Sequence, residues 1–350
     1  MGLFCCIMYY YMNYKKYAVK VVLATLLLGV GVGLGYQWGF NHEHDILVKS
    51  LNVIHPLRDH NPSYKFVSPL LAYIVPSADQ DAGLTALKNK VADFIDVQKK
   101  SNNLSDASVY LSDLNRGRWI GVNERQKYNP ASMLKVVVMV SYFKEAEIRP
   151  DILRKNLMYT ASAQEAIKKD FFNSSSQLEI GQWYTIQDLI EKMIVDSDNG
   201  AELLLFGNIN KDNLDAIYNV LNITSPDKMA DNFVISPRAY SLFFRVIYSA
   251  TYLNEDLSEK ALSILSKTTF DDGIVAGLST NLVVSHKFGE HVESSNNQVT
   301  SVELHDCGIV YYPVNPYFLC VMTKGKDIDQ LKSVIKNISS MVYQAYGSQQ

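Results

Sequence analysis

The C-terminal segment "DIDQLKSVIKNISSMVYQAY" (327–346) places apolar side chains at 331, 334, 335, 338, 341, 342 and 345. This spacing predicts an amphipathic helix with one apolar face, which needs a second layer to pack against. Strand-like segments precede it at 281–289, 301–312 and 317–324. We therefore expect the helix to cover one face of a sheet that these strands form.

A second helix and two more strands are predicted in the first part of the same domain. The segment 84–100 has apolar residues at 84, 87, 91, 94 and 95, which is again helical spacing. The segments 107–115 and 118–124 read as strands, because the turn-like Asn115-Arg116-Gly117 joins two runs rich in strand-forming residues.

The middle of the chain, from about residue 149 to 267, is mostly helical in pattern. One of its helices begins at Thr185-x-x-Asp188, which has the form of a capping box. The predicted fold class is α/β (α+β): a sheet layer with helices, plus an all-helical lobe at about 149–267, within one domain at 84–350.

The N-terminal part contains an apolar stretch at 21–38 that carries no charge, with Lys15, Lys16 and Lys20 just before it. This length is near the lower end of the ~20 apolar residues that cross a bilayer. The preceding lysines predict a single-pass anchor with residues 1–20 in the cytoplasm, a stalk at 39–83, and the domain on the extracytoplasmic side of the cell membrane. A cleaved signal peptide is the alternative, although its small-residue cleavage site is not evident.

Composition narrows the possible partners. The formal net charge is -3 and no basic cluster is interleaved with aromatic residues, so we expect no nucleic-acid partner. None of the four cysteines has the spacing of a metal site, and no metal or cofactor is predicted. Cys307 and Cys320 lie in a compartment that permits a disulfide. Because the cross-strand register is unknown from sequence, we interpret them as a buried free pair.

The segment "NPASMLKV" (129–136) places Ser132 at a predicted helix start and Lys135 one turn later in an apolar run. Positions i and i+3 share a helix face, so the amine can reach the hydroxyl. Burial lowers the pKa of a lysine, and a neutral amine beside a serine can activate it as a nucleophile. The alternative is a lysine that extends past apolar neighbours to solvent. Ser-x-x-Lys also occurs at Ser225 and Ser333, without this context.

Two further motifs follow Ser132 and Lys135 along the chain: Ser197-Asp198-Asn199, and Lys287-Phe288-Gly289 in a strand-like segment. Their order resembles the S-x-x-K, S-D-N and K-T-G elements of serine β-lactamases and penicillin-binding proteins. The chain is most similar to the class A β-lactamase-like branch over roughly residues 84–345. The resemblance implies an antiparallel sheet flanked by helices, and acyl transfer through a serine ester.

The resemblance also implies roles for individual residues. Ser132 attacks a carbonyl, Lys135 accepts its proton, and Ser197 passes a proton toward the leaving nitrogen. This assignment requires the three side chains to converge with that of Lys287, which adds positive potential and steadies the Ser197 hydroxyl.

Substrate binding is assigned in the same way. Asn199 binds the substrate amide, and the oxyanion lies between the backbone N–H groups of Ser132 and Glu290, the residue after Gly289. Preorganised donors of this kind are usually a leading contribution to catalysis, each worth ~3–4 kcal/mol.

The sequence departs from the family pattern at two places. Class A enzymes carry a loop glutamate that activates the deacylating water, but the segment 221–237 contains none; Asp227 and Asp231 are the nearest acids. Phe288 replaces the threonine of K-T-G and offers no hydrogen bond. His286 is a substitute donor, or else a strand side chain on the other sheet face.

These observations together predict a membrane-anchored serine hydrolase that forms an acyl-enzyme on Ser132. Its substrates would be β-lactams or small peptide-like amides of the bacterial cell wall. The alternative is a non-hydrolytic module that binds peptidoglycan or another ligand in a degenerate β-lactamase-like pocket. The missing glutamate predicts slow deacylation.

Overall fold

The computed structural model describes residues 57–58, 63–72, 82–102, 104–165, 178–226, 233–279, 282–295, 298–313 and 315–347. All of them belong to one compact unit within His55–Gln350. The predicted cytoplasmic segment 1–20 and anchor 21–38 lie outside the described residues. Among the helices that are described, none has the length and apolar composition to cross a bilayer.

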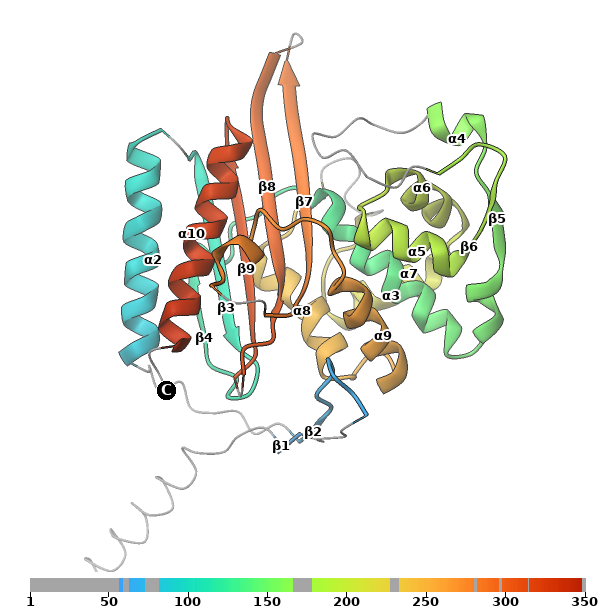
Figure 1. The fold of residues 1–350 in the computed structure, drawn as a ribbon, viewed down its shortest axis with the longest axis horizontal. Coiled ribbons are helices and arrows are strands. Elements are labelled where there is room, and N and C mark those ends of the chain that lie inside the picture. The colour runs from blue at the N-terminus through green and yellow to red at the C-terminus, as the bar shows by residue number, and fades with distance from the viewer. Residues whose placement is uncertain are drawn as a thin grey trace, which may run out of the picture. The chain divides into compact units, whose positions relative to one another are not determined.

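A five-stranded antiparallel sheet forms the centre of the domain, in the order β4-β3-β9-β8-β7. Figure 1 shows helices α2 and α10 on one side of this sheet and the helical lobe on the other. The predicted antiparallel sheet with flanking helices and a helical lobe is therefore confirmed. The bounds are β3 Asp106–Asp113, β4 Trp119–Val122, β7 Val284–Ser295, β8 Gln298–Val310, β9 Tyr317–Gly325, α2 Ala82–Lys100 and α10 Ile328–Gly347.

Both faces of the sheet are buried, so there are two apolar cores. Strand β9 shows the alternation: Leu319 and Val321 pack in the core beneath α2 and α10, while Phe318 and Met322 pack in the core of the helical lobe. Successive strand residues point to opposite faces, which gives this division. The apolar face predicted for the C-terminal helix lies in the first of these cores, with Leu331, Val334, Ile335, Ile338 and Val342 buried.

The helical lobe contains short helices around the buried α3. The bounds of its elements are α3 Lys135–Ala146, α4 Ala161–Glu165, α5 Ile186–Val195, α6 Asn199–Asn208, α7 Lys211–Val220, α8 Pro237–Tyr248 and α9 Glu255–Leu265. The capping box at Thr185 and Asp188 is present and begins α5. A two-stranded sheet of β5 (Asn156–Met158) and β6 (Trp183–Thr185) also lies in the lobe, and the helical reading did not anticipate it.

The described residues also include the 3-10 turns η1 Ala131–Leu134, η2 Pro150–Arg154 and η4 Val275–Gly277. Two short strands, β1 (Leu57–Arg58) and β2 (Leu70–Ala72), pair with each other within the predicted stalk. Of the described residues between them, Tyr64, Phe66 and Val67 pack in the core of the lobe. The buried Phe66 and Val67 donate their backbone N–H groups to Glu259 of α9 at 2.7 and 2.9 Å.

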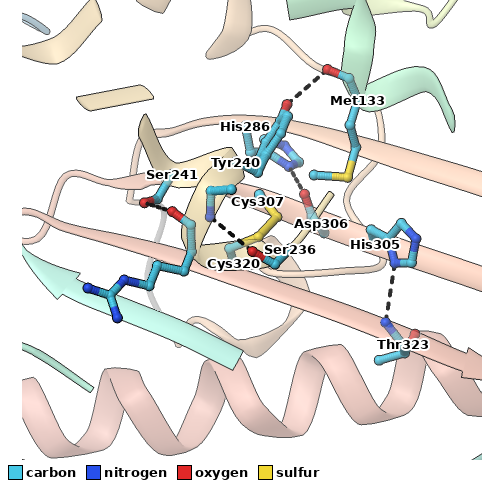
Figure 2. Close-up of a disulfide and its surroundings, with 12 residues drawn as sticks. Met133, Ser236, Tyr240, Ser241, His286, His305, Asp306, Cys307, Cys320 and Thr323 are labelled. Atoms are coloured by element: carbon cyan, nitrogen blue, oxygen red, sulfur yellow. Dashed lines mark hydrogen bonds and ion pairs between the residues drawn. A yellow bond between two sulfur atoms is a disulfide. The ribbon is translucent and has the colours of Figure 1, made fainter. Parts of the chain in front are cut away.

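Cys307 and Cys320 form a disulfide between β8 and β9, which corrects the interpretation of a free pair. The two residues are direct partners in the strand register, with Cα atoms 3.9 Å apart. Figure 2 shows the disulfide that joins these two strands. The sequence placed both cysteines on strands, but it did not give the register that makes them neighbours.

Candidate active site

Ser132 lies in η1, immediately before α3, and its side chain is half-buried. Ala131 has φ 46°, a left-handed conformation that is uncommon for a residue with a Cβ. Strain of this kind persists only where the surroundings hold the backbone firmly. The predicted helix start near Ser132 is thus a tight turn that leads into α3, whose first residue is Lys135.

Hydrogen bonds from helix α8 and strand β8 hold the turn that carries Ser132. The Tyr240 hydroxyl on α8 donates to the Met133 carbonyl at 3.0 Å, as Figure 2 shows. The backbone N–H of Asn129 donates to Glu303 on β8 at 2.9 Å. His305 accepts the Thr323 N–H through Nδ1, so its Nε2 carries the proton and donates to the Asn129 carbonyl at 3.0 Å.

Burial of Glu303 opposes ionisation of its carboxylate, but several donors outweigh that effect. The His305 Nε2–H and the Lys324 ammonium lie 3.5 and 3.0 Å from the carboxylate oxygens, and the Asn129 N–H donates a hydrogen bond. Together they lower the pKa of Glu303 to about 2. Glu303, which accepts the Asn129 N–H and so holds the Ser132 turn, is therefore an ionised carboxylate at neutral pH.

Gly289 lets the edge strand β7 approach this turn closely. A Cβ at position 289 would lie 2.4 Å from the Pro130 carbonyl oxygen and 2.8 Å from Cγ of Met133. Neither contact is sterically possible without movement of one segment. The glycine of the third motif is thus explained by close backbone packing between β7 and η1.

The amine of Lys135 is fully buried and lies against the Ser197-Asp198-Asn199 motif. It donates to the Ser197 carbonyl at 2.7 Å and to the Asn199 side-chain oxygen at 2.7 Å, and its Nζ lies 3.2 Å from the Ser197 hydroxyl. The alternative of a lysine that extends to solvent is excluded by this geometry. Ser197 has φ 56°, so this second left-handed residue also lies at the site.

Asp198 supports the same motif from behind. Its carboxylate accepts the Ala201 N–H at 2.9 Å and caps the N-terminus of α6. Burial raises the pKa of this carboxyl group above its usual range. Asp198 therefore has a structural role, as the residue that starts α6 directly after Ser197.

Lys287 reaches Ser197 from the opposite side. Its fully buried amine donates to the Ser197 hydroxyl at 3.0 Å and to the Phe288 carbonyl at 3.2 Å. Burial, followed by the positive charge of Lys135, lowers the pKa of the Lys287 ammonium well below its ordinary value. The Ser197 hydroxyl thus lies between two lysine amines.

Phe288, which replaces the threonine of the family motif, packs under Lys287. The Lys287 amine lies 4.0 Å from the centroid of the Phe288 ring, and this ring stacks on Phe270 at 4.3 Å. An aromatic face attracts a cation, so Phe288 favours the charged form of the amine.

His286 does not replace the missing threonine hydroxyl. It lies on the sheet face opposite Lys287, where its Nδ1 is 2.8 Å from a carboxylate oxygen of Asp306. The second Asp306 oxygen accepts the Ile274 N–H at 2.8 Å. His286 is therefore a buried strand side chain, which is the second of the two readings given for it.

The structure brings together Lys135, Ser197, Asn199 and Lys287, with Ser132 in the turn directly before Lys135. Glu290 follows Gly289 on β7, opposite Leu304 of β8. The other Ser-x-x-Lys serines lie elsewhere: Ser333 is exposed on α10, and Ser225 lies in the loop after α7. Asp227 and Asp231 lie outside the described residues. Within the described ranges no group of His, Cys, Asp and Glu is placed to hold a metal ion.

Sequence reasoning missed Glu202. This residue lies in the first turn of α6, and its carboxylate oxygen is 3.4 Å from the Lys135 amine. A signal was present: Glu202 is three residues after Asn199, so a helix that starts at Asn199 places both side chains on one face. The resemblance to class A enzymes instead pointed to an acid in the segment 221–237.

The antiparallel sheet, the helical lobe and the cluster of Lys135, Ser197 and Lys287 beside the turn of Ser132 are features of the superfamily of serine β-lactamases and penicillin-binding proteins. Within it, the chain belongs to the beta-lactamase enzyme family, whose model matches residues 86–346. No curated protein matches the chain significantly.

Solved structures share this fold at low sequence identity. PBP-A is 23% identical with a TM-score of 0.62, over 76% of this chain and 97% of PBP-A. A class A beta-lactamase from Mycobacterium abscessus is 17% identical with a TM-score of 0.61, over 73% and 99% of the two chains. A beta lactamase from Xanthomonas campestris pv. campestris is 18% identical with a TM-score of 0.62, over 75% and 99%.

Proposed function

We propose that the protein is a serine hydrolase that forms an acyl-enzyme on Ser132 with β-lactams or peptide-like amides. The observation that supports this most strongly is the placement of the Ser197 hydroxyl, 3.0 Å from the Lys287 amine and 3.2 Å from the Lys135 amine. A hydroxyl between two buried amines is a route for protons between a nucleophile and a leaving group.

The acylation step requires Lys135 to have lost its proton: the Ser132 oxygen attacks the amide carbon, and the Ser132 proton passes to the neutral amine of Lys135. The C–N bond then breaks. The Ser197 hydroxyl gives its proton to the leaving nitrogen and regains one from Lys135, so the products are a Ser132 ester and a free amine. Lys287 supports this transfer through its hydrogen bond to the same hydroxyl.

The oxyanion of the tetrahedral intermediate is assigned to the backbone N–H groups of Ser132 and Glu290. Support comes from Gly289, because its missing Cβ lets β7 pack directly against the turn that carries Ser132. Asn199 is assigned to the substrate amide, and its side-chain oxygen already accepts from Lys135 at 2.7 Å.

The substrate class follows from family membership and from one relative. A PBP-A mutant is described as an acyl-enzyme complex with penicillin G. The loss of the threonine hydroxyl at Phe288 means that a substrate carboxylate would find one donor fewer here. We therefore expect efficient acylation by amides whose anionic group is bound without a hydrogen bond from residue 288.

A non-hydrolytic binding module is the weaker proposal. Simple binding gives no reason to bury two lysine amines against one serine hydroxyl, because desolvation of each charge is costly. A binding module would also form no covalent bond to a penicillin, so the mass of the protein would stay unchanged.

Membrane anchoring is a separate proposal that rests on residues 21–38 and the lysines before them. It places the hydrolase domain outside the cytoplasmic membrane, close to cell-wall peptides. Extraction of cell membranes at alkaline pH tests it: the full-length chain should stay with the membrane, and a chain that lacks residues 1–38 should be released. Release of both would refute the anchor.

Intact-mass analysis and labelling with a fluorescent penicillin test the enzymatic proposal. The full-length protein should gain the mass of one penicillin, and Ser132→Ala should not. Ser333→Ala is the matched control, because Ser333 has the same Ser-x-x-Lys spacing but is exposed on α10. Equal labelling of Ser132→Ala and the wild type would refute the proposal.

A further inference from the structure

Glu202 is an acidic residue at the proposed site that the acylation step does not use. Its carboxylate oxygen Oε2 lies 3.4 Å from the Lys135 amine. The Glu202 side chain is 34% exposed, whereas that of Lys135 is fully buried. The carboxylate thus contacts the buried catalytic cluster while part of it faces solvent.

Helix α6 fixes this position. Asp198 caps the helix, Asn199 is its first residue, and Glu202 follows in the same turn. Residues at i and i+3 lie on one face, so Asn199 and Glu202 both point toward Lys135. Because α6 packs against α3 and α5, Glu202 is supported by the folded lobe.

Hydrolysis of a serine ester needs a group that takes a proton from the attacking water. The segment 221–237 contains no glutamate to do this. We infer that Glu202 is the proton acceptor for the deacylating water, and this inference rests on the proposed acyl-enzyme function. It assigns to α6 the glutamate that the loop lacks.

The proposed step balances as follows. The water oxygen bonds to the ester carbon while one water proton moves to the Glu202 carboxylate. The Glu202 proton passes to the neutral amine of Lys135, 3.4 Å away. The tetrahedral intermediate then collapses, the bond from the ester carbon to the Ser132 oxygen breaks, and that oxygen takes the proton from Lys135. A carboxylic acid product leaves, and Ser132, Lys135 and Glu202 return to their starting protonation states.

Asp198 is a poorer acceptor, although it is close in sequence. It is buried, and its oxygen is occupied by the Ala201 N–H that starts α6. Glu202 combines contact with Lys135 and access to solvent, which is what a water-activating carboxylate requires.

The test compares Glu202→Gln with the wild type in the full-length protein. Acylation and deacylation rates are measured separately, by stopped-flow with a chromogenic cephalosporin and by decay of the acyl-enzyme mass after excess reagent is removed. Glu202→Gln should acylate within about 3-fold of the wild type, and its deacylation should slow about 100-fold or more, the range for loss of a general base. Glu179→Gln is the control, because Glu179 is exposed on the lobe.

Two outcomes would overturn the inference. Unchanged deacylation in Glu202→Gln would show that another group activates the water. A parallel loss of acylation and deacylation would show that Glu202 only positions Lys135. If Glu202→Gln does not fold, as judged by thermal unfolding, Glu202→Asp replaces it: deacylation should slow with acylation retained. Failure of the wild type to acylate at all would instead refute the proposed function.

Discussion

A methyl group at position 289 should disable the protein without unfolding it. In Gly289→Ala the new Cβ would lie 2.4 Å from the Pro130 carbonyl oxygen. A carbon and an oxygen in contact are about 3.3 Å apart, so β7 and the Ser132 turn must separate by roughly 1 Å. That shift moves the Ser132 nucleophile relative to the β7 backbone assigned to the oxyanion.

The expected effect on rate follows from this displacement. A misplacement of about 1 Å costs on the order of 100-fold in rate, or about 2.7 kcal/mol in activation free energy. Overpacking of this kind lowers the free energy of unfolding by about 1–3 kcal/mol. The labelling rate should therefore fall about 100-fold while Gly289→Ala remains folded.

The assay is the second-order rate constant for labelling by a fluorescent penicillin, with thermal unfolding measured in parallel. Gly207→Ala is the matched control, because a Cβ at that exposed position on α6 meets nothing within 4 Å. The control should label at the wild-type rate and unfold at the same temperature or slightly higher. Labelling of Gly289→Ala within 3-fold of the wild type would refute the close-approach argument.

Three further predictions concern the groups around Ser132. The pKa of Glu303 is lowered to about 2, so its contribution to stability is present above its ordinary pKa near 4.5 and is lost as pH falls toward 2. As the pH falls from about 4.5 to about 2, the free energy of unfolding of the wild type should therefore decrease by on the order of 3 kcal/mol more than that of Glu303→Gln. Urea titrations at a series of pH values measure this difference, and equal pH profiles would contradict the prediction. Tyr240→Phe removes the hydrogen bond to the Met133 carbonyl and should cost about 1 kcal/mol in unfolding free energy, with a wild-type value counting against this role. Lys287→Met keeps a long side chain but removes the donor to Ser197, and acylation should slow about 100-fold in single-turnover labelling; an unchanged rate would exclude Lys287 from the proton route.

Features with a short range along the chain were predictable from sequence. The apolar spacing of 327–346 predicted α10, and the capping box predicted the start of α5, because both depend on residues within one or two helical turns. The apolar run around Lys135 left open whether its side chain is buried or extends to solvent, and the three motifs together favoured a lysine held at the site. Lys135 is buried against Ser197.

Features that join distant residues were decided by the tertiary structure. The disulfide depends on the register that pairs Cys307 with Cys320, and a shift of one residue would point them to opposite faces. The sequence allowed His286 to substitute for the missing threonine hydroxyl. In the structure, strand alternation places His286 on the sheet face opposite Lys287. Sequence spacing alone carries no information on such pairings.

The sequence by itself determined the fold class and indicated the serine, lysine and asparagine side chains that we propose for acylation, because helical and strand periodicities and short motifs are local properties of the chain. Tertiary structure alone decided the distances among them: the approach of Gly289 to Pro130, and the carboxylate of Glu202 beside Lys135. Those contacts arise where β7, η1, α3 and α6 pack together. Packing is set by the whole core, and no short stretch of sequence encodes it.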